Sequence, residues 1–474
     1  DTHGLPAVSL CTDSLDLFDY ESGIFVPGIH YDPLNPSWTG NYYESGREWE
    51  RLCNIEFYEM DNTGINQQAG LRTHGGNGRR FQQKCVKIYA REEYGKKRFK
   101  HSFFETLPNN SFKHLVLKPF ASSWNYTGAL DYLSNIYASS LDLETVASRP
   151  LVLYLNGEYW GIYYIHERPD ERYLEDHLGV NIDNVNIISG WNPILDHGTL
   201  LYFNQFYDWM ETADLSDDEA YSYAETKMDM SNFIDYQIFE LFSENTDWPA
   251  NNMRMWQEGD GPWRWIFYDG DACFRWNTFY AFDNSIYVGD EWWPSSTKAT
   301  LFFRKLLTNE TFTNRFKSRF LELLQTTFMY SALEPEFEHI KTSLEPEVPW
   351  QSQRFGFPAD IQTWVSDMGQ TRWFLQQRAE SLQGVLDGFL EVPEMASGSF
   401  VCYPNPSHDV IHVYVDCEAT EKGEVAIYDL LGRKVFAQHC EMHQGPNDIV
   451  LQPHLHAGIY VLRIGNLTRK IVRY

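Results

Sequence analysis

The chain lacks the features of a membrane-spanning or a nucleic-acid-binding protein. No stretch of its 474 residues approaches the roughly 20 consecutive apolar residues that a membrane-spanning helix needs. Positive charge is also scarce, because 38 Lys and Arg stand against 66 Asp and Glu and the formal net charge is −28. Duplex affinity depends on Lys and Arg that neutralise phosphates. We therefore expect neither a transmembrane segment nor general nucleic-acid binding.

Motifs for zinc binding and for serine nucleophiles are also missing. The seven cysteines include no C-x-x-C pair and no Cys/His cluster, so a structural zinc site is not expected. No G-x-S-x-G motif occurs, which argues against serine-nucleophile chemistry. Glycoside hydrolysis by paired carboxylates stays open on composition, but it would give the basic stretch described below no purpose.

Length and composition indicate a globular protein of two or three domains. Short alternating runs of β-branched and aromatic residues follow the segment MASGS, and they predict a small antiparallel, Ig-like β-sandwich over residues 397–474. Upstream, strand patterns come first and helical patterns later. This order favours an α+β fold for residues 1–396, with a β-rich lead-in over residues 1–65.

Three local patterns predict elements of the main domain. Two strand-like runs around Asn156-Gly157 predict a hairpin with a two-residue turn. Apolar residues at helical spacing after Ser231, a plausible N-cap, predict a buried amphipathic helix. A second long helix is expected over residues 361–389.

A basic stretch near a glycine-rich turn is the first candidate site. Between positions 72 and 118 there are twelve Lys or Arg and only three Asp or Glu. The pattern reads as strand, tight turn and strand, and the glycines allow backbone N–H groups to converge on an anion. Arg79 follows the turn, and Lys84 and Lys87 are predicted on the next strand, on opposite faces. Lys84 shares its face with apolar residues and is favoured as the buried cation, although a solvated basic hairpin would give the same sequence.

An acidic constellation over residues 244–274 is the second candidate site. Asp247 and Asn252 lie five apart in a Pro-containing loop, and an apolar strand then delivers Asp269 and Asp271. Carboxylate and amide oxygens suit Mg²⁺ or Mn²⁺ carrying phosphates, and the D-x-x-x-x-N spacing is that of a kinase catalytic loop. Calcium would also satisfy these ligands. The alternative makes Asp247 a loop cap and the D-G-D segment a turn.

A cation-rich turn together with an acidic metal site favours a nucleotide–metal complex, because each site compensates the charge of the other through the bound phosphates. Trp248 and Tyr163 are candidates for an adenine slot, with ordinary packing as the alternative. Glu167 could pair with the buried Lys, as a kinase Glu pairs with its strand Lys, or form a surface salt bridge.

Over residues 1–390 the chain resembles the spore-coat CotH kinase family. The segments that carry the resemblance are GLRTHGGNGRRFQQKCVKIYAREEYG, LYLNGEYWGIYYIHERPDERYL and NTDWPANNMRMW with WRWIFYDGDACF. The resemblance implies an atypical protein kinase that moves the ATP γ-phosphoryl group to Ser or Thr of a secreted partner.

Family roles can be carried over to matching positions. Lys84 and Arg79 would hold phosphates, and Asp247 would be the catalytic Asp. Lys87, Glu167 and Trp248 complete the predicted nucleotide-binding set without a role carried over from the family. The metal would be held by Asn252 and Asp269, with Asp271 as an alternate ligand. Gly78 stands where the family has Ser or Thr, and QQKC stands where it has PKKS. A binding protein without transfer activity, or a calcium-dependent glycan binder, is therefore the alternative.

The last 75 or so residues resemble the type IX secretion C-terminal sorting domain through YPNPSHDVI, VAIYDLLGRKV and LHAGIYVLRIGNLTRKIVRY. The resemblance implies contact with the type IX machinery, export across the outer membrane of a Bacteroidota cell, and a secreted or cell-surface location. The chain begins at Asp1 rather than Met, as it would after removal of a leader peptide or after any other cut.

Overall fold

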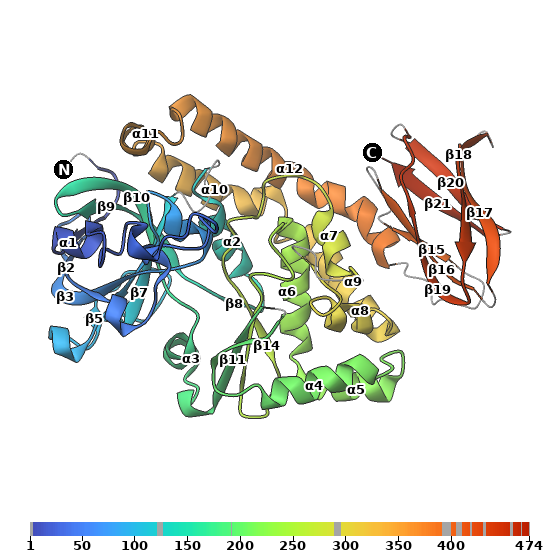
Figure 1. The fold of residues 1–474 in the computed structure, drawn as a ribbon, viewed down its shortest axis with the longest axis horizontal. Coiled ribbons are helices and arrows are strands. Elements are labelled where there is room, and N and C mark those ends of the chain that lie inside the picture. Colours follow the sequence, from blue (N-terminus) through green and yellow to red (C-terminus); the bar gives the residue numbers. More distant parts are fainter. Residues whose placement is uncertain are drawn as a thin grey trace.

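The computed structural model of the chain describes residues 3–120, 127–190, 192–288, 295–390, 400–403, 410–417, 420–429, 433–455, 458–465 and 467–473. These residues form a β-barrel, a second sheet surrounded by helices, and two sheets at the C-terminal end (Figure 1). The mixed α/β composition predicted from the sequence is confirmed. Within the described ranges, no helix combines the length and apolar character needed to span a membrane.

Seven strands close the barrel, and the alternation of side chains along them gives it an apolar interior. Val86 and Ile88 lie in the buried apolar cluster inside the barrel, together with Leu115 and Leu117 of a neighbouring strand. Because side chains alternate along a strand, Lys87 points to the outside. In barrel order, the strands are β1 (Ala7–Cys11), β2 (Arg51–Tyr58), β3 (Gly64–Thr73), β4 (Val86–Tyr89), β7 (His114–Pro119), β10 (Glu158–His166) and β9 (Ser148–Leu155).

The predicted hairpin is confirmed as β9 and β10. Asn156 and Gly157 form its turn with φ angles of 51° and 83°. Two consecutive positive φ angles define a type I′ turn, which Asn-Gly adopts readily. The hairpin delivers the segment after His166 to the side of the barrel that faces the rest of the chain.

The second sheet and its helices form the other half of the main domain. The predicted amphipathic helix is α6 (Met230–Ser243), but its N-cap is Asp229, whose side chain accepts hydrogen bonds from the backbone N–H groups of Ser231 and Asn232. The Ser231 cap was therefore wrong by two residues. In sheet order, the strands are β12 (Ile194–His197), β11 (Val185–Ser189), β13 (Arg254–Glu258), β14 (Arg264–Phe267) and β8 (Glu144–Thr145).

Helices surround this sheet and share one large apolar cluster with it. The predicted long helix is confirmed as the 30-residue α12 (Ile361–Leu390). The other helices are α1 (Ser14–Phe18), α2 (Leu130–Ala138), α3 (Glu171–Leu178), α4 (Leu201–Thr212), α5 (Asp218–Lys227), α7 (Tyr280–Ser285), α8 (Leu301–Leu306), α9 (Glu310–Leu324), α10 (Tyr330–Leu344) and α11 (Val348–Phe355), and a two-stranded sheet of β5 (Phe99–Lys100) and β6 (Ser111–Phe112) completes the set.

Beyond α12 the chain forms a three-stranded and a four-stranded sheet, drawn in red in Figure 1. Buried residues of both sheets make one apolar cluster. The predicted boundary between residues 396 and 397, and most of the YPNPSH motif, lie outside the described residues. The strands are β15 (Phe400–Tyr403), β16 (Ile411–Cys417) and β19 (Gly445–Leu451) in one sheet, and β18 (Lys434–Met442), β17 (Glu421–Asp429), β20 (Gly458–Ile464) and β21 (Leu467–Arg473) in the other.

Candidate functional site

The outer face of the barrel carries Arg, Lys and His side chains on neighbouring strands. The register of β3, β4, β7 and β10 places Arg72, Lys87, Val116 and His166 side by side across the sheet. Lys118 lies on the same face of β7, two residues from Val116, because alternate residues share a face. This face is turned towards the loops that follow α6 and β14.

Lys118 connects the barrel to the second half of the domain. Its ammonium lies 2.7 Å from Asp131 Oδ2 of α2 and 2.5 Å from Asp269 Oδ1, just after β14. Nε2 of His166 lies 3.7 Å from the same Asp131 oxygen. Burial disfavours the charged ammonium, but the carboxylates of Asp131, Asp269 and Asp271 outweigh burial and raise the pKa of Lys118. The lysine is therefore charged in the folded protein.

The turn after β14 is shaped to bring Asp269 to this lysine. Asp269 has a left-handed backbone with φ 60°, a conformation that non-glycine residues seldom adopt without support. The next N–H group, that of Gly270, donates to Asp131 Oδ1 at 2.8 Å. A Cβ atom at Gly270 would lie 2.0 Å from Ser134 Oγ, so only glycine permits this approach of the turn to α2.

The loop after α6 presents Asp247 beside this turn. Oδ2 of Asp247 accepts hydrogen bonds from the side-chain amides of Asn251 at 2.8 Å and Asn252 at 3.1 Å. The same Asn252 nitrogen lies 3.3 Å from the backbone oxygen of Asp269. The structure thus brings together Asp247, Asn252 and Asp269, as the sequence predicted.

Two successive buried hydrogen bonds, called here the Glu240–Asn245 relay, hold the backbone of Asp247 in position. The backbone N–H of Asp247 donates to Asn245 Oδ1 at 3.1 Å, and Asn245 Nδ2 donates to Glu240 Oε2 at 2.8 Å. Both Asn245 and Glu240 are fully buried. Burial raises the pKa of Glu240 to about 8, so this carboxyl is protonated at neutral pH.

Negative charge is concentrated at the site. Burial, with the charge of Asp269 as a smaller cause, raises the pKa of Asp247 to about 6. Burial and then the charge of Asp269 also raise the pKa of Asp271. A divalent cation would relieve this repulsion, and carboxylate and amide oxygens are its preferred ligands. Among the described residues, however, no three His, Cys, Asp or Glu side chains form a metal-binding group, so Asn252 and substrate phosphates would have to complete the shell.

Lys84 lies elsewhere. It precedes β4 instead of lying on it, so the prediction that placed it on the strand is wrong. Its buried ammonium donates to the backbone oxygens of Arg79 at 2.7 Å and Phe81 at 3.0 Å, and it lies 4.3 Å from the centre of the Tyr42 ring. The face that Val86 and Ile88 share is the closed barrel interior. Lys84 therefore stabilises the turn between β3 and β4 through these backbone oxygens. The lysine that reaches Asp269 is Lys118.

The other predicted nucleotide-binding side chains also have internal partners. Arg79 donates to the backbone oxygens of Gly75 and Tyr43. Glu167 lies 2.7 Å from His177 Nε2 and not beside a lysine. The acid that pairs with Lys118 is Asp131.

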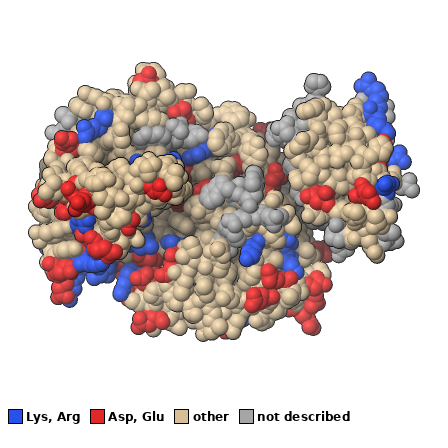
Figure 2. Space-filling model, viewed as in Figure 1, with Lys and Arg blue, Asp and Glu red and all other residues tan. Residues whose placement is uncertain are grey.

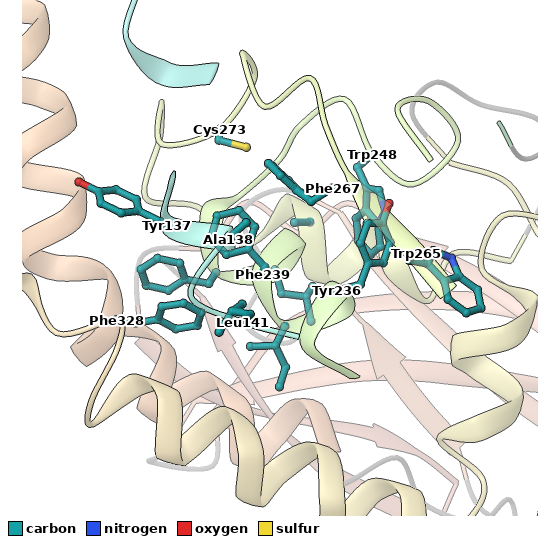
Figure 3. Packing of buried hydrophobic residues seen from close by; sticks show 14 of the residues in the cluster. Tyr137, Ala138, Leu141, Tyr236, Phe239, Trp248, Trp265, Phe267, Cys273 and Phe328 are labelled. Carbon is teal, nitrogen blue, oxygen red and sulfur yellow. The ribbon is translucent and has the colours of Figure 1, made fainter. Parts of the chain in front are cut away.

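The two aromatic candidates for an adenine slot are buried. Trp248 packs in the apolar core beside Tyr236, and its indole N–H donates to the Tyr236 hydroxyl at 3.0 Å (Figure 3). Tyr163 faces the barrel interior and donates to the backbone oxygen of Lys84 at 3.1 Å. Neither ring presents a free face to a ligand, so both are packing residues here.

Sequence reasoning missed Lys118, Asp131 and His166. One signal for Lys118 was available, because a lysine in the apolar run HLVLKPF is costly unless it is paired. Its partner Asp131 follows on the next helix, but only the barrel register places His166 near both.

Figure 2 shows Lys and Arg gathered over the barrel among larger groups of Asp and Glu, so the local basic excess lies within an acidic surface.

Two family comparisons match separate parts of the chain. Residues 71–382 match the family described as CotH kinase protein, and residues 401–473 match the secretion system C-terminal sorting domain. No curated protein matches the chain.

One similar solved structure is the HipA–HipB–operator DNA complex of a Shewanella oneidensis MR-1 toxin–antitoxin system. It is 12% identical, and the match covers 61% of this chain and 65% of that chain with a TM-score of 0.24. A likeness this distant supports no argument about fold or function.

Proposed function

Because the chain belongs to the CotH kinase family and carries a secretion sorting domain, we propose that it is a secreted atypical protein kinase. It would transfer the γ-phosphoryl group of ATP to Ser or Thr of a surface or secreted protein. The observation that carries the proposal is the contact of Lys118 with both Asp131 and Asp269, next to Asp247 and Asn252. A strand lysine paired with a helix acid, a catalytic-loop Asp and Asn, and an Asp after a strand are the working parts of a protein kinase.

Each side chain has a role that follows from its position. Lys118 would bind a phosphate oxygen, with Asp131 holding its ammonium in place. Asp247 would accept the proton of the acceptor hydroxyl, and its pKa of about 6 suits a base that works near neutral pH. Asn251 and Asn252 hold one Asp247 oxygen by hydrogen bonds, which leaves the other for the acceptor.

The donor set fits a Mg²⁺ or Mn²⁺ ion that accompanies ATP. Asn252 and Asp269 would hold it, with Asp271 nearby as a further carboxylate. Such an ion neutralises charge that develops on the transferred phosphoryl group. Burial is the main cause of the raised pKa of Asp247 and of Asp271, and the charge of Asp269 raises both pKa values further. A cation at this position would offset both effects.

A transfer assay with γ-labelled ATP and Mg²⁺ or Mn²⁺ tests the proposal. The full chain should label a Ser- or Thr-containing acceptor or itself, and Asp247→Asn should lower the rate about 100-fold or more. Asp269→Asn should abolish metal-dependent transfer. Asp260 offers a matched control, because it is an exposed Asp on the β13–β14 turn paired with Lys227, and Asp260→Asn should leave the rate unchanged.

The alternative is a surface protein of the same family that binds without transfer. In that case the wild-type chain would show no labelling above the Asp269→Asn level. A melting-temperature shift by ATP with Mn²⁺ would then tell a nucleotide-binding protein from one that binds neither, because a ligand that binds only the folded state stabilises it by mass action.

A further inference from the structure

A cavity of about 930 Å³ lies between the barrel and the helices α2 and α10. Residues 104–107 and the start of β9 line it on the barrel side, and residues 141–147 also form part of its wall. Pockets for small ligands measure about 300 to 1,000 Å³, so this cavity is large enough for an organic molecule. The proposed kinase function does not use it.

The cavity is separate from the site that Lys118 serves. Four residues of α2 line it at the spacing of one helical face, and Asp131, which contacts Lys118, is not among them. Neither Asp247 nor Asp269 lines it. A ligand in this cavity would therefore not occupy the position proposed for the phosphates. The four residues of α2 are Tyr132, Asn135, Ile136 and Ser139.

The wall of the cavity offers apolar surface to a ligand. Phe104 and Leu107 line it from the barrel side, Ile136 lines it from α2, and Leu141 lines it from the loop after α2. Leu107 and Ile136 are only partly buried. Covering such side chains removes apolar surface from water, which favours a ligand with an apolar body.

Two carboxylates meet at Tyr132 in the wall of this cavity. The Tyr132 hydroxyl donates to Glu336 of α10. Burial raises the pKa of Tyr132, and the hydrogen bond to Glu336 and the charges of Glu336 and Glu105 raise it further, so both carboxylates act on this hydroxyl. Glu105 and Glu336 also line the cavity. Within the described part of the chain, neither has a Lys, Arg or His at ion-pair distance.

The arginines of the cavity are engaged by other acids. Arg264 contacts Asp142 and Glu144, each at 2.9 Å. Arg149 contacts Glu59 at 2.7 Å. Neither arginine is therefore available to balance the two carboxylates at Tyr132.

The two histidines of the cavity do not balance these carboxylates either. His177 pairs with Glu167 at 2.7 Å. His339 lies one helical turn after Glu336 on α10 and lines the cavity, but its ring is not at ion-pair distance from any carboxylate that the structure describes. Negative charge therefore remains uncompensated at Tyr132, and a cation in the cavity would be attracted to it.

We propose that this cavity binds a small organic cation with an apolar body, such as an arylalkylamine. Its charged group pairs with Glu336 and Glu105, and its apolar part packs against Phe104 and Ile136. The site goes beyond the proposed kinase function and does not depend on it, because its binding test needs neither nucleotide nor transfer.

Calorimetric titration of the full chain with phenethylamine tests this site, with phenethyl alcohol as the uncharged probe of similar shape. At pH 8 an alkylamine is charged, whereas histidines are mostly neutral. Wild type should bind the amine at millimolar concentration or below, about tenfold more tightly than the alcohol, because the amine adds a hydrogen bond to a charged group. Glu336→Gln should lower the affinity for the amine to about that for the alcohol.

Glu345→Gln is the matched control. Glu345 follows α10 directly, pairs with Lys341 at 3.0 Å and does not line the cavity. Its variant should bind the amine as wild type does. Ser139→Trp locates the site, because Ser139 is an exposed residue of the cavity wall and a large side chain there should block both probes.

Each outcome decides the point. Glu105 is exposed, so Glu105→Gln keeps the proposal testable even if Glu336→Gln does not fold. A wild type that binds no amine at millimolar concentration, or that binds amine and alcohol equally, overturns the site. Unchanged affinity for the amine in the folded Glu variants, or in Ser139→Trp, overturns it as well. Asp269→Asn should bind the amine as wild type does, so loss of transfer and loss of this site are told apart.

Discussion

The ammonium of Lys118 contacts the carboxylate of Asp269 at 2.5 Å, across the junction between the barrel and the β14 turn. The two residues are 151 positions apart, so the contact exists only in the folded chain. Through this contact, Lys118 of β7 lies against Asp269, a carboxylate that the sequence predicts as a metal ligand.

Loss of Lys118 should affect both stability and transfer. Lys118→Met leaves the buried Asp131 without its cation, and breaking a buried ion pair in this way costs about 3 kcal/mol. Urea unfolding at pH 7 measures this cost. Transfer should fall to background in the folded variant. A Lys118→Met protein with wild-type transfer would remove Lys118 from the site.

The Glu240–Asn245 relay should matter for transfer more than for stability. Asn245→Ala removes the acceptor of the Asp247 backbone N–H, so the folded variant should lose about 100-fold in rate, a typical general-base contribution. Glu240→Gln should have little effect, because the Glu240 carboxyl is already neutral at pH 7, with a pKa of about 8, and Gln also offers an acceptor to Asn245. Equal rates for Asn245→Ala and wild type would contradict the relay.

The buried pair of Arg378 and Glu244 should stabilise the end of α6. Both side chains are fully buried, and Arg378 also donates to the backbone oxygens of Leu241 and Phe242. Arg378→Ala should cost at least about 3 kcal/mol. Arg372, on the same helix and paired with Glu338 near the surface, is the control, and its Ala variant should cost less than about 1 kcal/mol. Similar urea midpoints for the two variants would contradict this view.

Glu50 should make stability depend on acid pH. Burial alone would raise its pKa, but hydrogen bonds from Arg91 and Tyr94 outweigh burial and lower the pKa from 4.5 to about 2. The stabilisation is therefore present above pH 4.5 and is lost as the pH falls towards 2. At pH 7, Glu50→Gln should cost about 1 to 2 kcal/mol after allowance for solvent screening. The difference from wild type should shrink by pH 3, and a constant difference would contradict the assignment.

The sequence predicted the parts of the site that are local and missed those that depend on barrel register. Asp247, Asn252 and Asp269 were recognisable because a fixed spacing and an apolar strand place them near one another. The sequence pattern favours the face that Lys84 would share with Val86 and Ile88 as the site, but Lys84 precedes β4 instead of lying on it. In a closed barrel, that face is the core, so the chemistry lies on the other face.

The remaining contacts could not be predicted from local patterns. Asp131 and Lys118 lie thirteen positions apart, yet they pair because α2 packs beside β7. The left-handed backbone of Asp269 and the close packing of Gly270 against Ser134 depend on tertiary contacts that no propensity encodes. Trp248 looked like a stacking ring for a base, but a large aromatic residue more often fills a core.

A crystal of the full chain with a non-hydrolysable ATP analogue and Mn²⁺ tests the central claim most directly. We predict metal density bounded by oxygens of Asp269 and Asn252, and a phosphate oxygen about 3 Å from the Lys118 ammonium. Nucleotide bound away from the outer barrel face, or a metal that contacts neither residue, would contradict the kinase proposal.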